Sequence, residues 1–321
     1  TPTSAEPRRI GRRRAGDQEM LLFFLFALLA GAAGFLVFKF ATVVDGDLTL
    51  VSRGPPRRDR VDGKVVWITG ASRGIGEVLA MQFANLGAKL ILSARNKDVL
   101  ERVKQNILSK NPDSRIEVLP MDLSAGEESL KQVVHAAESL FSNAGIDYMI
   151  HNAAFERPVN ITLYLCYLFN SVNISIINEG HWKRMRKATF NVNVIGTINL
   201  TRLLAPYMLD RGMGHFVVMS SAAGKVPAPV LVSHYSPLSS SLQKRVSVER
   251  CAELTIVAAT HGLKEAWISY QPVLTVMYLV QYMPTVGYWL MDKVGAKRLD
   301  AAAKKGNTYS WNLMFSGKKS P

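Results

Sequence analysis

The sequence predicts an α/β domain built on a doubly wound parallel sheet, preceded by one transmembrane helix. Short β-branched runs alternate with helical stretches from about residue 62, and a glycine-rich turn follows the first of these runs. An uncharged apolar stretch precedes the domain. With 321 residues, 48% of them hydrophobic and 20% charged, the chain has enough apolar material for one large core.

The amino-terminal part contains an anchor signal. Residues 20–38 read MLLFFLFALLAGAAGFLVF, and at about 1.5 Å per residue this run matches the hydrocarbon core of a bilayer. It predicts a single-pass anchor over residues 20–44, after a basic extension over 1–19 and before a linker over 45–61. A cleaved signal peptide is the alternative, because small residues lie in the second half of the run. Basic residues flank both ends, so the positive-inside rule does not choose the side on which the domain lies.

Charge and cysteine content argue against two classes of function. The formal net charge is +14, but the basic runs contain no interleaved aromatic residues, which argues against nucleic-acid binding and favours membrane-flanking or solvated charge. The two cysteines, Cys166 and Cys251, lie far apart and outside any metal-ligand spacing. We therefore expect neither a nucleic-acid partner nor a metal.

A dinucleotide-binding turn follows the first predicted strand. The run KVVWIT, residues 64–69, leads into GASRGIG and then into the helical stretch EVLAMQFANLG. Strand, glycine turn and helix in this order are typical of a Rossmann fold, whereas a glycine cluster alone would be a weak signal. Gly70 permits a tight turn, Gly74 lets the backbone approach a pyrophosphate, and Gly76 allows the helix to pack closely. The predicted cofactor residues of this turn are Gly70, Ser72, Arg73, Gly74, Ile75 and Gly76.

The end of the second strand selects the cofactor. The run AKLILSAR ends about 18 residues beyond the last glycine, where an NAD site would offer an acidic residue to the ribose. Here Arg95 offers a cation, and Arg73 offers another from the turn. These two residues predict the 2′-phosphate of NADP(H), although a surface salt bridge is the alternative for Arg95 alone.

Three more strands complete the predicted domain, which spans residues 62–265. The third, 115–119, is followed by Asp122 and Leu123. The fourth, 147–150, is followed by His151, Asn152, Ala153 and Ala154, and the fifth leads to Ser221 in HFVVMSS. This alternation of strands and helices describes a parallel sheet.

The motifs TGASRGIG, DL and HNAA, in this order, resemble the short-chain dehydrogenase/reductase superfamily. Within it the chain looks closest to the membrane-anchored branch of 11β-hydroxysteroid dehydrogenases and dehydrogenase/reductase member 7, especially the plant forms. The likeness runs from about Asp62 to Tyr235 and resumes near Lys244. It implies that Asp122 and Leu123 lie at the adenine and that Asn152 and Ala153 lie beside the cofactor.

The resemblance also implies a catalytic group. Asn193, in FNVNVIGT, would bind a water that relays protons, Ser221 would orient a carbonyl oxygen, and Tyr235 would donate a proton to it. Taken singly, these residues also fit a polar helix residue, a strand-end cap and a core aromatic. As a set they imply NADP(H)-dependent interconversion of a carbonyl and a secondary alcohol on a lipophilic substrate such as a steroid.

The catalytic pattern breaks after Tyr235. The family has a lysine four residues later, where its ammonium binds the ribose and lowers the pKa of the phenol, but position 239 is a serine. Lys244 lies nine residues on, on the opposite face of an ideal helix, and Pro237 disfavours a continuous helix.

Segment lengths also depart from the family. Only residues 236–263 separate Tyr235 from the strand-like KEAWISY, residues 264–270, which predicts a sheet that lacks one strand and helix. Residues 159–187 are longer than the family's connection. A retained intron and a skipped exon would explain both departures. The alternative function is therefore a non-catalytic or misfolded isoform that retains NADP(H) binding at most.

The carboxyl-terminal segment, residues 266–321, ends in a basic tail. Residues 266–291 carry no charge and contain several Tyr and Trp residues, which favours a substrate lid that contacts membrane lipid, with core packing as the alternative. The terminal Lys318 and Lys319 resemble an endoplasmic-reticulum retrieval signal. We expect a single-pass protein of that membrane, and the sequence leaves homo-oligomerisation open.

Overall fold

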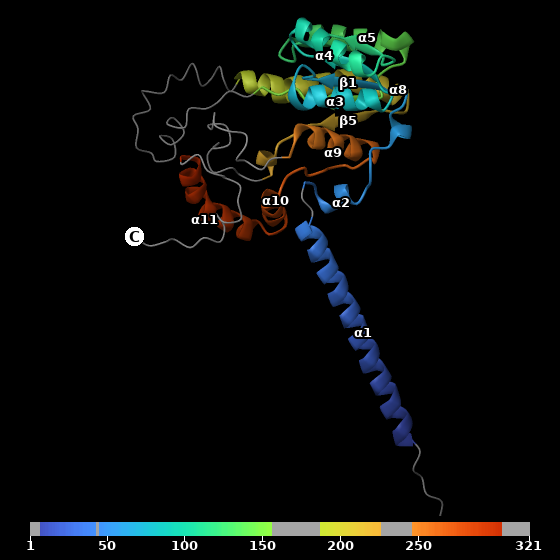
Figure 1. Ribbon diagram of the computed structural model, residues 1–321, viewed down its shortest axis with the longest axis vertical. Helices are drawn as coiled ribbons and strands as arrows, with labels where there is room; N and C mark the ends of the chain where they lie inside the picture. The colour runs from blue at the N-terminus through green and yellow to red at the C-terminus, as the bar shows by residue number, and fades with distance from the viewer. Residues whose placement is uncertain (1–6, 43–44, 156–186, 226–245, 304–321) are drawn as a thin grey trace, which may run out of the picture. The chain divides into compact units, whose positions relative to one another are not determined.

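The computed structural model describes residues 7–42, 45–155, 187–225 and 246–303 (Figure 1). The chain divides into two compact units, residues 1–44 and 45–321. The predictions for Tyr235, Lys244, residues 159–186 and the basic tail lie outside the described residues.

The first unit is a single helix. Helix α1 (Pro7–Thr42) is 36 residues long, and its large apolar side chains from Met20 to Phe35, like that of Phe38, are exposed. Over the part of the chain that the structure describes, no helix combines the length and the apolar character needed to cross a membrane. The predicted spanning helix over residues 20–44 is therefore not confirmed.

The second unit contains a parallel sheet with the strand order β3-β2-β1-β4-β5. Strand β1 is central, and its Thr69 lies opposite Ser93 of β2 while its Ile68 lies opposite Ile150 of β4. The first five of the predicted strands are present: β1 (Val65–Thr69), β2 (Lys89–Ser93), β3 (Ile116–Val118), β4 (Tyr148–His151) and β5 (His215–Val218).

Helices cover both faces of the sheet, as the predicted doubly wound fold requires. Alternate side chains of β1 point to opposite faces, so Val66 and Ile68 belong to one apolar cluster and Val65 and Trp67 to the other. The first cluster is closed by helices α3 (Gly74–Asn85), α4 (Lys97–Lys110) and α9 (Val248–Thr260), and the second by α5 (Glu127–Asn143) and α8 (Thr197–Asp210).

The sheet ends at β5 within the described residues. Phe216 and Val218 on this strand are exposed, although strands of parallel sheets are usually covered on both faces. No strand follows β5 in the described residues, and the prediction that the sheet lacks a strand stays a prediction.

The strand expected over residues 264–270 is not formed, and that prediction was wrong. The segment is irregular, because the backbone of Trp267 pairs with Asp47 instead of with a sheet strand. The Asp47 N–H donates to the Trp267 carbonyl at 2.8 Å, and the Trp267 N–H donates to the Asp47 carboxylate at 2.5 Å.

The segment expected as a linker, residues 45–61, instead packs on the domain. It contains α2 (Leu48–Val51) and η1 (Arg58–Arg60), and Leu50 is buried against Leu254 and Val257 of α9. Asp45 forms an ion pair with Arg250 at 2.7 Å. Burial of apolar surface and this pairing therefore extend the folded unit toward the amino terminus.

The uncharged carboxyl-terminal segment forms a helical hairpin. Helix α10 (Val273–Tyr282) is followed almost at once by α11 (Pro284–Ala303), and the two pack against each other. Val276 and Val280 of α10 bury side chains against Met291 of α11. Ala222 and Trp267 join this cluster, which fixes the hairpin beside the segment that follows β5.

Candidate functional site

The Thr69 hydroxyl connects the ends of β1 and β4. It donates to the Ile150 carbonyl at 3.2 Å and accepts from the backbone N–H groups of Asn152 and Ala153, each at 3.1 Å. Thr69 is buried and Asn152 and Ala153 are half-buried, so these backbone groups need partners within the chain. The Thr69 side chain thus provides hydrogen-bond partners for the backbone at the point where β4 ends.

The Asn152 side chain fixes the glycine turn. Its amide nitrogen donates to the Thr69 carbonyl at 3.1 Å and to the Gly70 carbonyl at 3.2 Å. Asn152 therefore lies beside the turn and helps to fix the direction in which the turn leaves β1. Its place beside a cofactor stays a prediction.

Two glycines are required by the geometry of this turn. Gly70 has a φ of +66°, and a Cβ there would lie 2.8 Å from the Cα of Ala153. A Cβ on Gly76 would lie 2.6 Å from the Asn152 amide nitrogen and would overlap the Gly70 carbonyl. The amino end of α3 can approach the turn only because both side chains are absent.

The amino end of α3 has the properties of a phosphate site. Arg73 is the N-cap residue in an extended conformation, and no side chain caps the N–H groups of the first turn. Gly74 and Ile75 supply backbone of that turn, and Ser72 is half-buried beside it. Uncapped N–H groups and the helix dipole both favour an anion, so the residues present fit a dinucleotide pyrophosphate.

The two predicted arginines lie at one edge of the sheet. Thr69 is opposite Ser93, so Arg73 and Arg95 follow the carboxyl ends of neighbouring strands. Both side chains are exposed, and neither has a hydrogen-bond or ion-pair partner in the described part of the chain. Their positive charge is therefore not neutralised by a described carboxylate.

Asp122 and Leu123 continue this edge after β3. The Asp122 carboxylate accepts from the backbone N–H of Ser124 at 2.9 Å and from its hydroxyl at 2.7 Å, while the residue stays exposed. Leu123 is buried, and a Cβ on Gly196 would overlap its carbonyl oxygen. This contact seats the segment that carries Asn193.

Asn193 lies in a π-helical segment, η3 (Asn191–Gly196), that leads into α8. Its amide oxygen accepts from the Phe155 N–H at 2.7 Å, and its amide nitrogen donates to the Phe155 carbonyl at 3.1 Å. Asn193 therefore holds the backbone just beyond Ala153 and Ala154. Single π-helical turns are frequent at functional sites.

Ser221 lies three residues beyond β5, at the start of η4 (Ala222–Gly224). Its carbonyl accepts from the Gly224 N–H at 2.9 Å, and the residue is exposed. The glycine turn with Arg73, Arg95 and Asp122 is called the nucleotide edge below, after the predicted ligand. The structure brings these residues, Asn193 and the end of β5 to the carboxyl side of the sheet. Tyr235 lies outside the described residues.

Sequence reasoning gave no role to His151, the last residue of β4. Its Nε2 lies 2.9 Å from the Thr201 hydroxyl, which donates to the Thr197 carbonyl at 2.8 Å. Because that hydroxyl has one proton, Nε2 must be the donor, which leaves Nδ1 as a buried acceptor without a described partner. Burial lowers the pKa of His151 to about 4. The imidazole is therefore neutral at pH 7.

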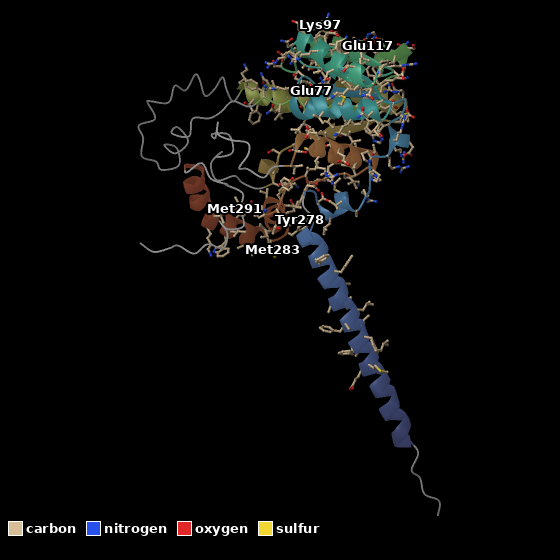
Figure 2. All side chains as sticks on the ribbon, in the orientation of Figure 1. Glu77, Lys97, Glu117, Tyr278, Met283 and Met291 are labelled. Atoms are coloured by element: carbon tan, nitrogen blue, oxygen red, sulfur yellow. The ribbon has the colours of Figure 1, made fainter. Side chains whose placement is uncertain are left out.

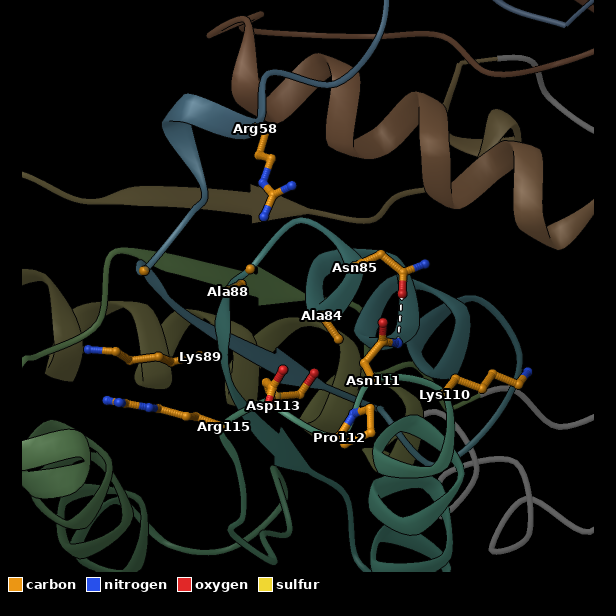
Figure 3. Close-up of a pocket in the computed structure, with 13 residues that line it drawn as sticks. Arg58, Ala84, Asn85, Ala88, Lys89, Lys110, Asn111, Pro112, Asp113 and Arg115 are labelled. Carbon is orange, nitrogen blue, oxygen red and sulfur yellow. Dashed lines mark hydrogen bonds between the residues drawn. The ribbon is translucent and has the colours of Figure 1, made fainter.

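A surface pocket of about 590 Å³ lies away from this site (Figure 3). It is lined by Lys89 and Arg115, at the amino ends of β2 and β3, and by Asn85 and Lys110, at the carboxyl ends of α3 and α4. Figure 3 shows Lys89 and Arg115 extending to one side and Lys110 to the other. The cations diverge, and the pocket belongs to the opposite edge of the sheet.

Comparison with known proteins connects this arrangement with one family. The sequence model of the short chain dehydrogenase family matches residues 64–237. The chain is 30% identical to dehydrogenase/reductase SDR family member 7 of Homo sapiens, over 80% of this chain and 86% of the relative. It is 31% identical to 11-beta-hydroxysteroid dehydrogenase A of Sesamum indicum, over 76% of this chain and 62% of the relative. A solved metagenomic short-chain oxidoreductase in complex with NADP is 22% identical, over 69% of this chain and 79% of that chain, with a TM-score of 0.41.

Replacement of Thr69 by valine tests the connection between β1 and β4. The variant Thr69→Val keeps the shape but removes the described acceptor of the Ala153 N–H and one of the two acceptors of the Asn152 N–H, so the free energy of unfolding should fall by about 1–3 kcal/mol. Thr69→Ser keeps the hydroxyl and is the matched control. Urea unfolding followed by tryptophan fluorescence measures both. Equal losses in the two variants would show that the hydroxyl is not the stabilising group.

The pKa of His151 predicts how stability depends on pH. The unfolded chain binds a proton near pH 6.5, whereas the folded chain resists it until about pH 4. Above pH 6.5 His151 is neutral in both states and does not reduce the free energy of unfolding. As pH falls from 6.5 to 4, protonation of the unfolded chain lowers that free energy by about 3 kcal/mol at most. His151→Gln should flatten that part of the profile in unfolding experiments across this range. An unchanged slope would contradict the assignment.

Proposed function

The chain belongs to the short-chain dehydrogenase family, and from that premise we propose that it is an NADP(H)-dependent oxidoreductase acting on a lipophilic carbonyl or secondary alcohol. The observation that carries the proposal is the uncapped amino end of α3 together with the guanidinium groups of Arg73 and Arg95, which have no partner among the described residues. An oxidoreductase activity follows from the family, the cofactor is inferred from these residues, and the substrate class is inferred from other features.

The nucleotide edge assigns each part of the cofactor to a group of the chain. The N–H groups of Gly74 and Ile75 would hold the pyrophosphate, Arg73 and Arg95 the 2′-phosphate, and Asp122 the adenine. Arginine suits this role because its planar group binds phosphate through two hydrogen bonds. When bound, NADP(H) supplies or accepts the hydride.

On the substrate side, the chain provides hydrogen-bonding groups at the ends of β4 and β5. The Ser221 hydroxyl would orient the substrate oxygen, and Tyr235 would exchange a proton with it. Asn193 holds the backbone at Phe155 and so fixes the segment that follows β4. The water that the resemblance implies at Asn193 stays a prediction.

The substrate class rests on the character of the carboxyl-terminal segment and on the relatives. The sesame relative is named for a hydroxysteroid. The uncharged segment 266–291 packs against Ala222, the residue that follows Ser221. An apolar wall beside the proposed oxygen-binding group favours a lipophilic molecule over a sugar or an acid.

We also propose that the protein works at the endoplasmic-reticulum membrane. The large apolar side chains of α1 from Met20 to Phe35, and that of Phe38, are exposed, and such a run of exposed apolar side chains supports association with lipid. The terminal Lys318 and Lys319 supply the resemblance to a retrieval signal.

A second candidate function is NADP(H) binding without turnover. Ser239 occupies the position of the family's lysine, and the described sheet ends at β5 with apolar side chains exposed. Both observations concern the substrate side, whereas the nucleotide edge is built from residues before 155. An isoform could therefore bind the cofactor and not react.

Cofactor preference can be measured by titrating the detergent-solubilised full chain with NADPH and NADH and following nucleotide fluorescence. Arg73→Ala and Arg95→Ala should each weaken NADPH binding by about 10–100-fold, because each removes a charge-assisted hydrogen bond. The affinity for NADH should change little. Arg115→Ala, which removes the same charge at the opposite edge of the sheet, is the control. Equal wild-type affinities for the two nucleotides, insensitive to Arg73 and Arg95, would contradict the cofactor assignment.

Turnover separates the two candidate functions. We expect NADPH-dependent reduction of steroid and other lipophilic ketones by the full chain, and a loss of about 100-fold or more in Tyr235→Phe, which lacks the proton donor. The assay follows NADPH absorbance across a panel of carbonyl compounds. NADPH binding without turnover, together with activity that appears in Ser239→Lys, would overturn the enzymatic proposal in favour of the binding isoform.

A further inference from the structure

The bend between α10 and α11 presents large apolar side chains to the surface. We call residues 282–289 the hairpin tip; Tyr282, Met283, Val286, Tyr288 and Trp289 within it are between 46% and 70% exposed. Figure 2 labels Met283 at this bend and Tyr278 and Met291 on the two helices that it joins. Five such side chains in eight residues form a contiguous apolar surface rather than scattered exposure.

These side chains are not required by the hairpin's own core. That core is made by Val276, Met277 and Val280 of α10 with Met291 of α11, all of them buried. The helices approach so closely at Gly287 that a Cβ there would lie 2.7 Å from the Cα of Val280. The hairpin is thus held from inside. Tyr282 also lies against the rings of Tyr278 and Trp267, whereas the exposed side chains of Met283, Val286 and Tyr288 take no part in the buried cluster.

The tip has the composition of a membrane interface. It is rich in Tyr and Trp, whose rings combine an apolar body with a polar group, and residues 266–291 carry no charge. The first lysine beyond the tip, Lys293, places its Nζ 4.9 Å from the Trp289 ring centroid. A cation at the border of an aromatic surface suits phospholipid headgroups; Asp292 precedes Lys293, but residues 282–289 themselves carry no acidic side chain.

We propose that the hairpin tip docks on the surface of a lipid bilayer. This docking surface is separate from α1 and does not require the chain to bind NADP(H). It also has a consequence that rests on the proposed function. Lys225 lies four residues beyond Ser221, and its Nζ contacts Gln281 of α10 at 3.2 Å and Glu265 at 2.9 Å. Docking would hold the substrate side of the sheet at the bilayer, so that a lipophilic substrate could enter from lipid.

The test places an environment-sensitive fluorophore at the tip of the full chain. Cys166 and Cys251 are replaced by serine, and a single cysteine is introduced by Met283→Cys or, as control, by Ser109→Cys on the exposed surface of α4. Each protein is labelled with a nitrobenzoxadiazole dye and reconstituted into vesicles of phosphatidylcholine and phosphatidylserine. We expect a blue-shifted emission, several-fold brighter at 283 than at 109, that lipid-borne nitroxide quenches at 283 only.

Equal emission and equal quenching at the two positions would overturn the proposal. A bright signal at 283 that depends on protein concentration and is not quenched by lipid nitroxide would also overturn it, because a second copy of the chain would then cover the tip. NADPH titration of the same vesicles keeps the two proposals apart. Lipid quenching at 283 without NADPH binding would support docking and count against the proposed function alone.

Discussion

The close approach of the turn after β1 to the end of β4 is the constraint on which the site depends. Three parallel strands deliver their following segments to the same edge, and polar backbone groups there would be buried without partners. The Thr69 hydroxyl and the Asn152 amide satisfy them, and the missing side chains of Gly70 and Gly76 let α3 begin directly against the turn. The uncapped end of α3 is therefore held in place before any ligand binds, which reduces the ordering cost of binding.

A second set of contacts connects the end of β4 with the residues proposed to bind the substrate. His151 bonds to Thr201 of α8 through its ring and accepts the Met219 N–H through its carbonyl at 2.9 Å. Asn193 joins the same helix region to the backbone at Phe155. The end of β4 thus couples the nucleotide edge to both α8 and the segment that follows β5. Beyond β5 the described sheet adds no strand, so the substrate side is supported by the α10–α11 hairpin instead.

Local patterns predicted the fold well. The five β-branched runs and the glycine turn are short-range signals, and the structure confirms the strands and the turn. Contacts between distant residues were not predictable. The polar, proline-containing segment 45–61 has a linker's composition, yet Leu50 is buried by side chains about 200 residues away. The apolar residues of 264–270 suggested a strand, but the backbone partner of Trp267 is Asp47, a residue that no pattern connects with it. Thr69 was overlooked because threonine in a strand is ordinary, and only its three hydrogen bonds distinguish it.

Ser239 bears on the direction of the proposed reaction more than on cofactor binding. A lysine beside the catalytic tyrosine would lower a phenol pKa that is otherwise about 10. Without that cation, a phenol keeps its proton at pH 7, which is the state needed to donate to a carbonyl oxygen. Oxidation of an alcohol requires the opposite state, the phenolate, which such a phenol rarely reaches. Under the proposed function, the loss of the lysine removes one contact to the ribose but leaves the groups proposed to hold the phosphates, and it penalises oxidation most. Reduction by NADPH is therefore the reaction that this sequence best preserves.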